Sequence, residues 1–278
     1  MRLSTLLAST VLATVVATSA ASAAPYVFTW NPSLTSGGTL SSPSPTSPIL
    51  TAHNMHITDY ATITNIGSPV VSETGILVVN SFDLNAPSVV TPGFVSGGGG
   101  GAAGAVPGAS PYQLYFTFSS TSHLVSDGLG GFTGAFDSLS YTLWGDIGGT
   151  CQFGLSGISV CSAANQLVLA TGSLAAGPNG VSIDSDGIPA AHADVDIHLG
   201  ANAGGFFVNP ATLGGFVFET SFTNTFGIVG HPNASTITID GGGGNIDLLG
   251  VPEPVTLSVF GAGLAGAAAL RRRKAKKA

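Results

Sequence analysis

Residues 192–199, HADVDIHL, alternate polar and apolar side chains and contain two histidines and two aspartates. In a β-strand, His192, Asp194, Asp196 and His198 would project from one face. Imidazoles and carboxylates in such a group can bind a divalent metal ion. A strand rises ~3.3 Å per residue, so the outer two side chains would lie about 20 Å apart and could not share one ion. We therefore expect a solvent-facing strand in which histidine reduces Asp–Asp repulsion, and we keep Asp194 and Asp196 as metal candidates.

A second acidic segment, Asp184-Ser185-Asp186-Gly187, begins like a calcium-binding loop. An EF-hand would need a Glu at its twelfth position, where this chain has Val195. Asp side chains also accept local backbone hydrogen bonds in turns, and the sequence favours that interpretation. Asp184 and Asp186 remain candidates for Ca²⁺, and no other cofactor is expected.

Catalytic patterns elsewhere are incomplete. Residues 53–59 contain two histidines and an aspartate but lack the HExxH spacing of zinc proteases. Residues 154–158 miss the GxSxG pattern of hydrolases at its last position. Glu73 and Glu219 are the only glutamates between residues 24 and 250, which offers little to paired-carboxylate glycoside hydrolysis. We expect a non-enzymatic protein, with a secreted glycan or ester hydrolase and a calcium-dependent adhesive module as the alternatives.

Positive charge is confined to the two ends of the chain. No Lys or Arg occurs between Leu3 and Leu270, and six then follow within residues 271–277. Residues 24–250 hold thirteen of the fourteen acidic residues, because only Glu253 lies outside them. Nucleic acids and anionic membrane surfaces are bound through basic side chains, so this composition argues against both as partners of the body. Cations, including calcium, are its natural counter-charge.

Residues 1–23 have the organisation of a secretory signal peptide. Arg2 precedes an apolar stretch from Leu6 to Val16, and Ala21-Ser22-Ala23 offers small residues to signal peptidase. We expect cleavage after Ala23 and export of the rest.

The two cysteines, Cys151 and Cys161, fit an oxidising compartment. We expect a disulfide that stabilises the fold by roughly 2–3 kcal/mol, with two free thiols as the alternative.

The C-terminal residues 251–278 contain a short motif, an apolar run and a basic cluster. The motif is Pro252-Glu253-Pro254, the run is Val255–Leu270, and the cluster comprises Arg271, Arg272, Arg273, Lys274, Lys276 and Lys277. A helix of this length would rise about 24 Å, slightly less than the ~30 Å hydrocarbon core, and would span a thin or locally adjusted bilayer. The basic cluster would then stay cytoplasmic. A GxGxxG match within the run lacks the βαβ context of a dinucleotide site and is better explained by close packing of a membrane helix.

This motif, run and cluster, in this order, resemble the PEP-CTERM sorting signal of Gram-negative bacteria. The resemblance implies recognition by an exosortase, a membrane-embedded cysteine protease-transpeptidase, and removal of the tail near the Pro-Glu-Pro motif. Proteins of this type accompany exopolysaccharide production, biofilm and floc formation. Four short body segments also resemble the flocculation-associated PEP-CTERM proteins; they are residues 112–118, 167–174, 205–210 and 222–225.

The resemblance therefore predicts an exported cell-surface or extracellular matrix protein that is transiently anchored in the inner membrane. Its expected partners are signal peptidase and exosortase during processing, the membrane through the C-terminal helix before processing, and extracellular polysaccharide.

The body, residues 24–240, consists of β-rich runs separated by Gly, Pro, Asn and Asp clusters. We predict ten strands, at residues 26–30, 57–66, 75–84, 112–120, 139–144, 166–174, 193–199, 206–209, 216–226 and 235–240. They predict an all-β, antiparallel sandwich or jelly-roll-like domain, and a barrel is the alternative that the pattern leaves open. The glycine-rich residues 241–250 are predicted to be a stalk before the single-helix anchor.

Overall fold

The computed structural model describes residues 27–30, 50–84, 112–159, 161–201, 203, 206–208, 213–221, 228–229 and 235–250. Nearly all of them lie in antiparallel β-strands, which confirms the all-β prediction. The predicted signal peptide, the Pro-Glu-Pro motif and the C-terminal anchor lie outside these residues. Within the described segments, no helix is long and apolar enough to cross a membrane.

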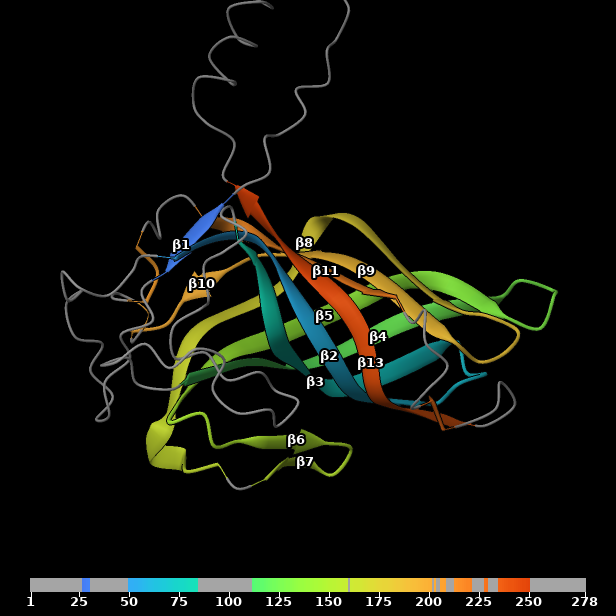
Figure 1. Ribbon diagram of the computed structural model, residues 1–278. Helices are drawn as coiled ribbons and strands as arrows, with labels where there is room; N and C mark the ends of the chain where they lie inside the picture. The colour runs from blue at the N-terminus through green and yellow to red at the C-terminus, as the bar shows by residue number, and fades with distance from the viewer. Residues whose placement is uncertain are drawn as a thin grey trace, which may run out of the picture.

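Eight strands form one closed antiparallel barrel (Figure 1). In the order of pairing they are β2 (Leu50–Thr64), β3 (Val70–Leu84), β4 (Tyr112–Ser126), β5 (Phe132–Ile147), β8 (Gln166–Ile183), β9 (Pro189–Val195), β11 (Leu213–Ser221) and β13 (Thr236–Gly250). Strand β13 pairs with β2 from Thr236 opposite Thr64 to Asp247 opposite Asn54, and this pairing closes the barrel.

The predicted sandwich or jelly roll is therefore wrong, and the barrel that the sequence left open is correct. Each long strand pairs with the next long strand in the chain, so the sheet coils until its last strand meets its first. A closed sheet has one interior face instead of two facing sheets, and no exposed edge remains along the ring. Alternation within a strand does not distinguish these arrangements, because both bury every second side chain.

Several strands are longer than predicted because tight turns join them directly. Between β2 and β3, Asn65 adopts a left-handed conformation with φ of 63°, and its carbonyl accepts a hydrogen bond from the Ser68 N–H at 2.9 Å. Between β4 and β5, the Asp127 N–H donates to the Gly131 carbonyl at 3.0 Å. These turns form hairpins whose arms have 15 or 16 residues.

The predicted stalk, residues 241–250, is instead the C-terminal two thirds of β13. Gly241 has φ of 89°, and it lies where the β13–β2 register shifts between Asp240 and Gly242, as in a glycine β-bulge. A Cβ atom on Gly244 would lie 2.4 Å from the Glu219 carbonyl of β11, so glycine lets the two backbones approach closely. The glycines therefore serve strand bending and close packing, which composition alone does not distinguish from a flexible linker.

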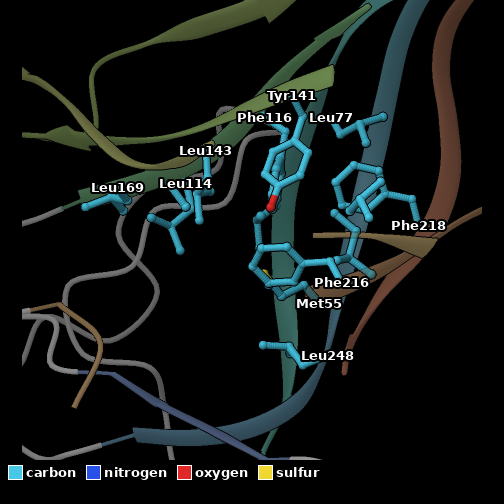
Figure 2. Packing of buried hydrophobic residues seen from close by; sticks show 14 of the residues in the cluster. Met55, Leu77, Leu114, Phe116, Tyr141, Leu143, Leu169, Phe216, Phe218 and Leu248 are labelled. Carbon is cyan, nitrogen blue, oxygen red and sulfur yellow. The ribbon is translucent and has the colours of Figure 1, made fainter. Parts of the chain in front are cut away.

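The barrel interior is filled by inward-facing apolar side chains. Phe116 lies at its centre, and its ring lies 5.7 Å from Tyr141, 5.8 Å from Phe216 and 5.4 Å from Phe218, measured between centroids. Figure 2 shows these rings together with Met55, Leu77 and Leu248 from the neighbouring strands.

A short strand outside the ring of eight also contributes a side chain to the core. Strand β1 (Phe28–Trp30) pairs with β2, and Trp30 is fully buried. The Trp30 indole N–H donates a hydrogen bond of 3.0 Å to the Tyr112 hydroxyl. Of the predicted strand 206–209 the structure describes residues 206–208, and among these Phe207 forms an isolated bridge with Trp30.

A small hairpin packs on the outside of the barrel (bottom of Figure 1). It consists of β6 (Gln152–Gly154) and β7 (Gly157–Ser159), and a 3₁₀ turn, η1 (Ala163–Asn165), leads back to β8. A disulfide joins Cys151 to Cys161, whose Cα atoms lie 4.5 Å apart. Cys151 also packs in a small apolar cluster with Tyr115, so the disulfide attaches the hairpin to the outer face of β4. The two remaining short strands are β10 (His198–Leu199), which pairs with β8, and β12 (Ile228–Val229), which pairs with β13.

Candidate functional site

Asp184 and Asp186, the calcium candidates, lie in the turn between β8 and β9. The Asp184 Oδ1 atom accepts hydrogen bonds from the backbone N–H groups of Asp186 at 2.9 Å and Ile188 at 2.8 Å. The Gly187 N–H completes the turn by donating to the Asp184 carbonyl at 3.0 Å. The arrangement is that of an aspartate-stabilised turn, in which this carboxylate oxygen accepts hydrogen bonds from the backbone of the turn.

Asp194 and Asp196 do not share one strand face as the alternation suggested. Strand β9 ends at Val195, and Asp196 lies in the two-residue gap before β10. The Asp196 Oδ1 atom accepts a hydrogen bond of 2.5 Å from the Ser173 N–H of β8. Among the described residues, no group of three or more His, Cys, Asp or Glu side chains is arranged to hold a metal ion.

The histidines of the same segment pair with different carboxylates. His192 lies 3.1 Å from Glu219 Oε1 through Nδ1 and 3.8 Å from Asp194 Oδ1 through Nε2. His198 Nε2 lies 3.3 Å from Asp196 Oδ2. His192 therefore lies between the carboxyl groups of Glu219 and Asp194, and His198 lies next to that of Asp196.

A row of polar side chains crosses the outside of the barrel at His192. In register, His192 of β9 lies opposite Glu219 of β11, Glu219 opposite Asn245 of β13, and Asn245 opposite His56 of β2. His56 makes contacts of 2.8 Å with Asn245 Oδ1 and 3.0 Å with Asp83 Oδ1. The four strands come from distant parts of the chain, so sequence spacing gave no signal for this row.

A groove of about 420 Å³ lies along part of this row. His192, Glu219 and Asn245 line it with hydrogen-bonding groups, and glycine and alanine residues make much of the remaining wall. At one side, the β5–β8 pairing is interrupted between Gly134 and Ser140, and Gly134 lines the groove there. The groove is therefore a depression with hydrogen-bonding side chains in a wall of mostly small residues, and neither Lys nor Arg is among the described residues that line it.

The barrel interior contains two carboxyl groups that sequence patterns did not single out as a pair. Asp59 of β2 is 1% exposed, and Glu73 of the neighbouring β3 is partly buried. Both line a small cavity of about 20 Å³. Burial raises the pKa of Glu73 to about 7, and burial together with the Glu73 charge raises the pKa of Asp59 well above its usual range. The available signal was that Asp59 alternates with Ile57, Ala61 and Ile63, which places a carboxyl group on the inward face.

A third buried carboxyl group, that of Asp146, has a structural role. Its Oδ2 atom accepts hydrogen bonds from the backbone N–H groups of Thr150 at 2.9 Å and Cys151 at 3.3 Å. Burial raises the pKa of Asp146, and these two hydrogen bonds oppose the increase. Asp146 therefore fixes the segment that leads into the outer hairpin. Ser156, which belongs to the incomplete hydrolase pattern, is exposed in the turn between β6 and β7.

The predicted sorting residues Pro252, Glu253 and Pro254 and the basic cluster that begins at Arg271 lie outside the described residues. No family model matches the chain, and no curated protein or solved structure shows significant similarity to it.

Proposed function

We propose that this chain is an exported, non-catalytic barrel protein that is delivered to the cell exterior by its C-terminal sorting signal. There it contributes to the cohesion of an exopolysaccharide matrix. The observation that carries the proposal is the distribution of charge: residues 24–250 hold thirteen acidic residues and no Lys or Arg, while the positive charges lie at the two ends. Basic ends of this kind are used for targeting, and an acidic body without bases can remain soluble and unattached to anionic surfaces.

The barrel gives this body a stable form without salt bridges from Lys or Arg. Hydrogen-bonded strand pairing around the whole ring leaves no free edge in it that could recruit other chains. The outer face carries hydroxyl and carboxyl groups, for example the Ser119–Ser140 pair at 3.1 Å and the Thr121–Ser138 pair at 2.7 Å. Such a surface suits hydrated, hydroxyl-rich polymers.

The sorting step is tested by replacing Pro252, Glu253 and Pro254 with alanine in producing cells. We expect the wild-type chain to appear outside the cells with a mass that lacks the tail, and the variant to remain cell-associated with its tail. The matched control replaces Pro43, Ser44 and Pro45, an equally proline-rich triplet, and should be processed like the wild type. Intact mass spectrometry of cell fractions measures both. Normal processing of the Pro252-Glu253-Pro254 variant would contradict the proposal.

The matrix role is tested with a deletion strain. We expect the strain to lose cohesion while its polysaccharide yield stays unchanged, and the wild-type gene should restore flocs. Loss of polysaccharide itself would argue for a role in synthesis. Turnover of a glycan or ester by the purified protein would favour the hydrolase alternative.

For polysaccharide contact, we propose the groove that contains His192, Glu219 and Asn245. Its amide, imidazole and carboxylate groups can bond to hydroxyl or amino groups of a sugar, and its charge excludes acidic polymers. Glu219→Gln should weaken binding of a deacetylated amino-sugar oligomer by about tenfold or more, because a hydrogen bond to a charged group contributes roughly 1.5–3 kcal/mol.

Asp137→Asn is the matched control for this groove variant, because Asp137 pairs with His123 in the same way outside the groove. Calorimetric titration with the amino-sugar oligomer and with a uronic-acid oligomer measures the effect. Equal weakening by both variants would point to general charge attraction, and binding of the uronic-acid oligomer would exclude the proposed specificity.

A further inference from the structure

Asp59 and Glu73 bring two acidic groups into the interior of the barrel without a basic partner. They belong to paired strands, with Asp59 opposite Leu77 and Glu73 opposite Ile63. The Oδ1 atom of Asp59 is buried and accepts no hydrogen bond from any described residue. Such a group is costly in its ionised form, because neither water nor a donor compensates its charge.

Two small residues occupy the inward positions between the two acids. The inward positions that separate them are Ala61 on β2 and Gly75 on β3, which lie directly opposite each other. A Cβ atom on Gly75 would lie 2.7 Å from the Ala61 Cβ atom, so only glycine fits there. The ring of Phe118 packs over Gly75, with its Cε1 atom 2.8 Å from the position of that Cβ atom, and the two acids line the same small cavity beside it.

The other side chains that face the cavity are uncharged. Strands β4, β5 and β9 contribute phenylalanine, leucine and alanine, and β11 contributes Phe218 and Thr220. Ser120 of β4 lies opposite Glu73 in register, and its hydroxyl group lowers the pKa of Glu73 and partly opposes the effect of burial. No Lys or Arg occurs in the body that could neutralise the pair.

Protons can reach this pair from solvent. The cavity and the outer groove share two lining residues, Ala191 and Thr220, so the two spaces adjoin. The cavity has room for roughly one water molecule, which can carry a proton between solvent and the carboxyl groups.

We propose that Asp59 and Glu73 form a proton-dependent latch that holds the barrel closed in its protonated state. Protonation removes the charge of each group, whereas two carboxylates beside the same cavity repel each other and no cation compensates them. Loss of the protons therefore loosens the contact between β2 and β3 and the adjoining wall of the groove.

The direction of the pH dependence follows from proton binding. Both groups hold protons more tightly in the folded chain than in the unfolded chain, where ordinary pKa values are about 4. The stabilisation is complete below about pH 4 and is lost as pH rises through the raised pKa values of the two groups, that of Glu73 being about 7. Across this interval, the equilibrium constant for unfolding should rise by up to tenfold per pH unit for each proton bound only by the folded state.

Urea unfolding of the purified full-length chain between pH 4.5 and 8.5 tests the latch. We expect the wild-type midpoint to fall as pH rises, and we expect D59N and E73Q to flatten the curve and raise the midpoint at pH 8.5. D146N controls for the third buried carboxyl group, and D137N controls for an exposed one. Infrared difference spectra should also show the band of a protonated carboxyl group at pH 6 in the wild type and its reduction in each latch variant.

Three outcomes would overturn the latch. One is a flat wild-type curve between pH 4.5 and 8.5. Another is a slope that D146N abolishes while D59N and E73Q leave it intact. The third is stabilisation by calcium at pH 8.5 that D59N removes, which would show that the carboxylates bind a cation instead of protons. If D59N fails to fold, E73Q and the infrared spectrum of the wild type still decide the question. Each of these outcomes would leave the proposed sorting and polysaccharide binding standing, because those proposals are tested separately.

Discussion

A chain truncated after Asp240 should fail to form the barrel, whereas a chain that ends at Gly250 should fold. Residues 242–247 of β13 pair with residues 54–59 of β2 on one side, and residues 244–250 pair with β11 on the other. Truncation at Asp240 therefore leaves long edges of both β2 and β11 unpaired and opens the ring. It also removes Ile246 and Leu248, two buried core side chains.

The expected loss is comparable with the whole free energy of unfolding of a typical domain. Burial of two large aliphatic side chains contributes about 3–6 kcal/mol, and the lost strand pairing adds to it, against a total of about 5–15 kcal/mol. Circular dichroism and size-exclusion chromatography of the two truncated chains measure the outcome. A cooperative thermal transition in the chain that ends at Asp240 would contradict closure by β13, and the chain that ends at Gly250 is the control that should retain the transition.

This boundary also constrains the proposed processing. Cleavage near Pro252-Glu253-Pro254 would leave β13 complete, because the strand ends at Gly250. Cleavage within the glycine run would destroy the barrel that the sorting step is proposed to release. The position of the motif directly after β13 is thus compatible with release of a folded body, and the mass of the mature chain locates the cut.

Local sequence patterns were sufficient for the strand content and insufficient for the closure of the sheet. The alternation in segments such as 112–120 identified β4, and Phe116 and Leu114 lie on its inward face as the pattern required. Closure depends on the pairing of β2 with β13, about 180 residues apart, and no local pattern contains that information. The glycine-rich segment 241–250 was wrongly predicted to be a stalk for a related reason, because its strand conformation is imposed by pairing with β2 on one side and β11 on the other.

In the candidate sites, too, local patterns predicted local contacts but not contacts between strands. Asp184 was correctly interpreted as a turn residue, because its hydrogen bonds are to backbone groups within four positions. The row from His192 to Glu219 and the Asp59–Glu73 pair depend on register between strands. A single inward-facing aspartate in an apolar alternation was visible at Asp59, but its partner could be found only when β3 was aligned with β2.

Phe116→Ala should lower the free energy of unfolding more than Phe116→Leu or Leu129→Ala. The side chain is fully buried, and three aromatic rings from β5 and β11 lie within 6 Å of its centroid. Truncation removes the transfer free energy of the ring, leaves a cavity and ends these three ring contacts, which together cost about 3–5 kcal/mol. Because Phe216 and Phe218 are held in β11 by pairing with β9 and β13, the wall cannot collapse to fill the space.

Graded substitutions separate the cavity from a general effect of altering β4. Phe116→Leu should cost less than Phe116→Ala, since part of the volume is kept, and Leu129→Ala should change the free energy of unfolding by less than about 0.5 kcal/mol because Leu129 is 84% exposed in the β4–β5 turn. Urea unfolding at a single pH measures all three. If Phe116→Ala were no worse than Leu129→Ala, the aromatic cluster would not be the centre of the barrel core, and closure of the sheet would have to be stabilised elsewhere.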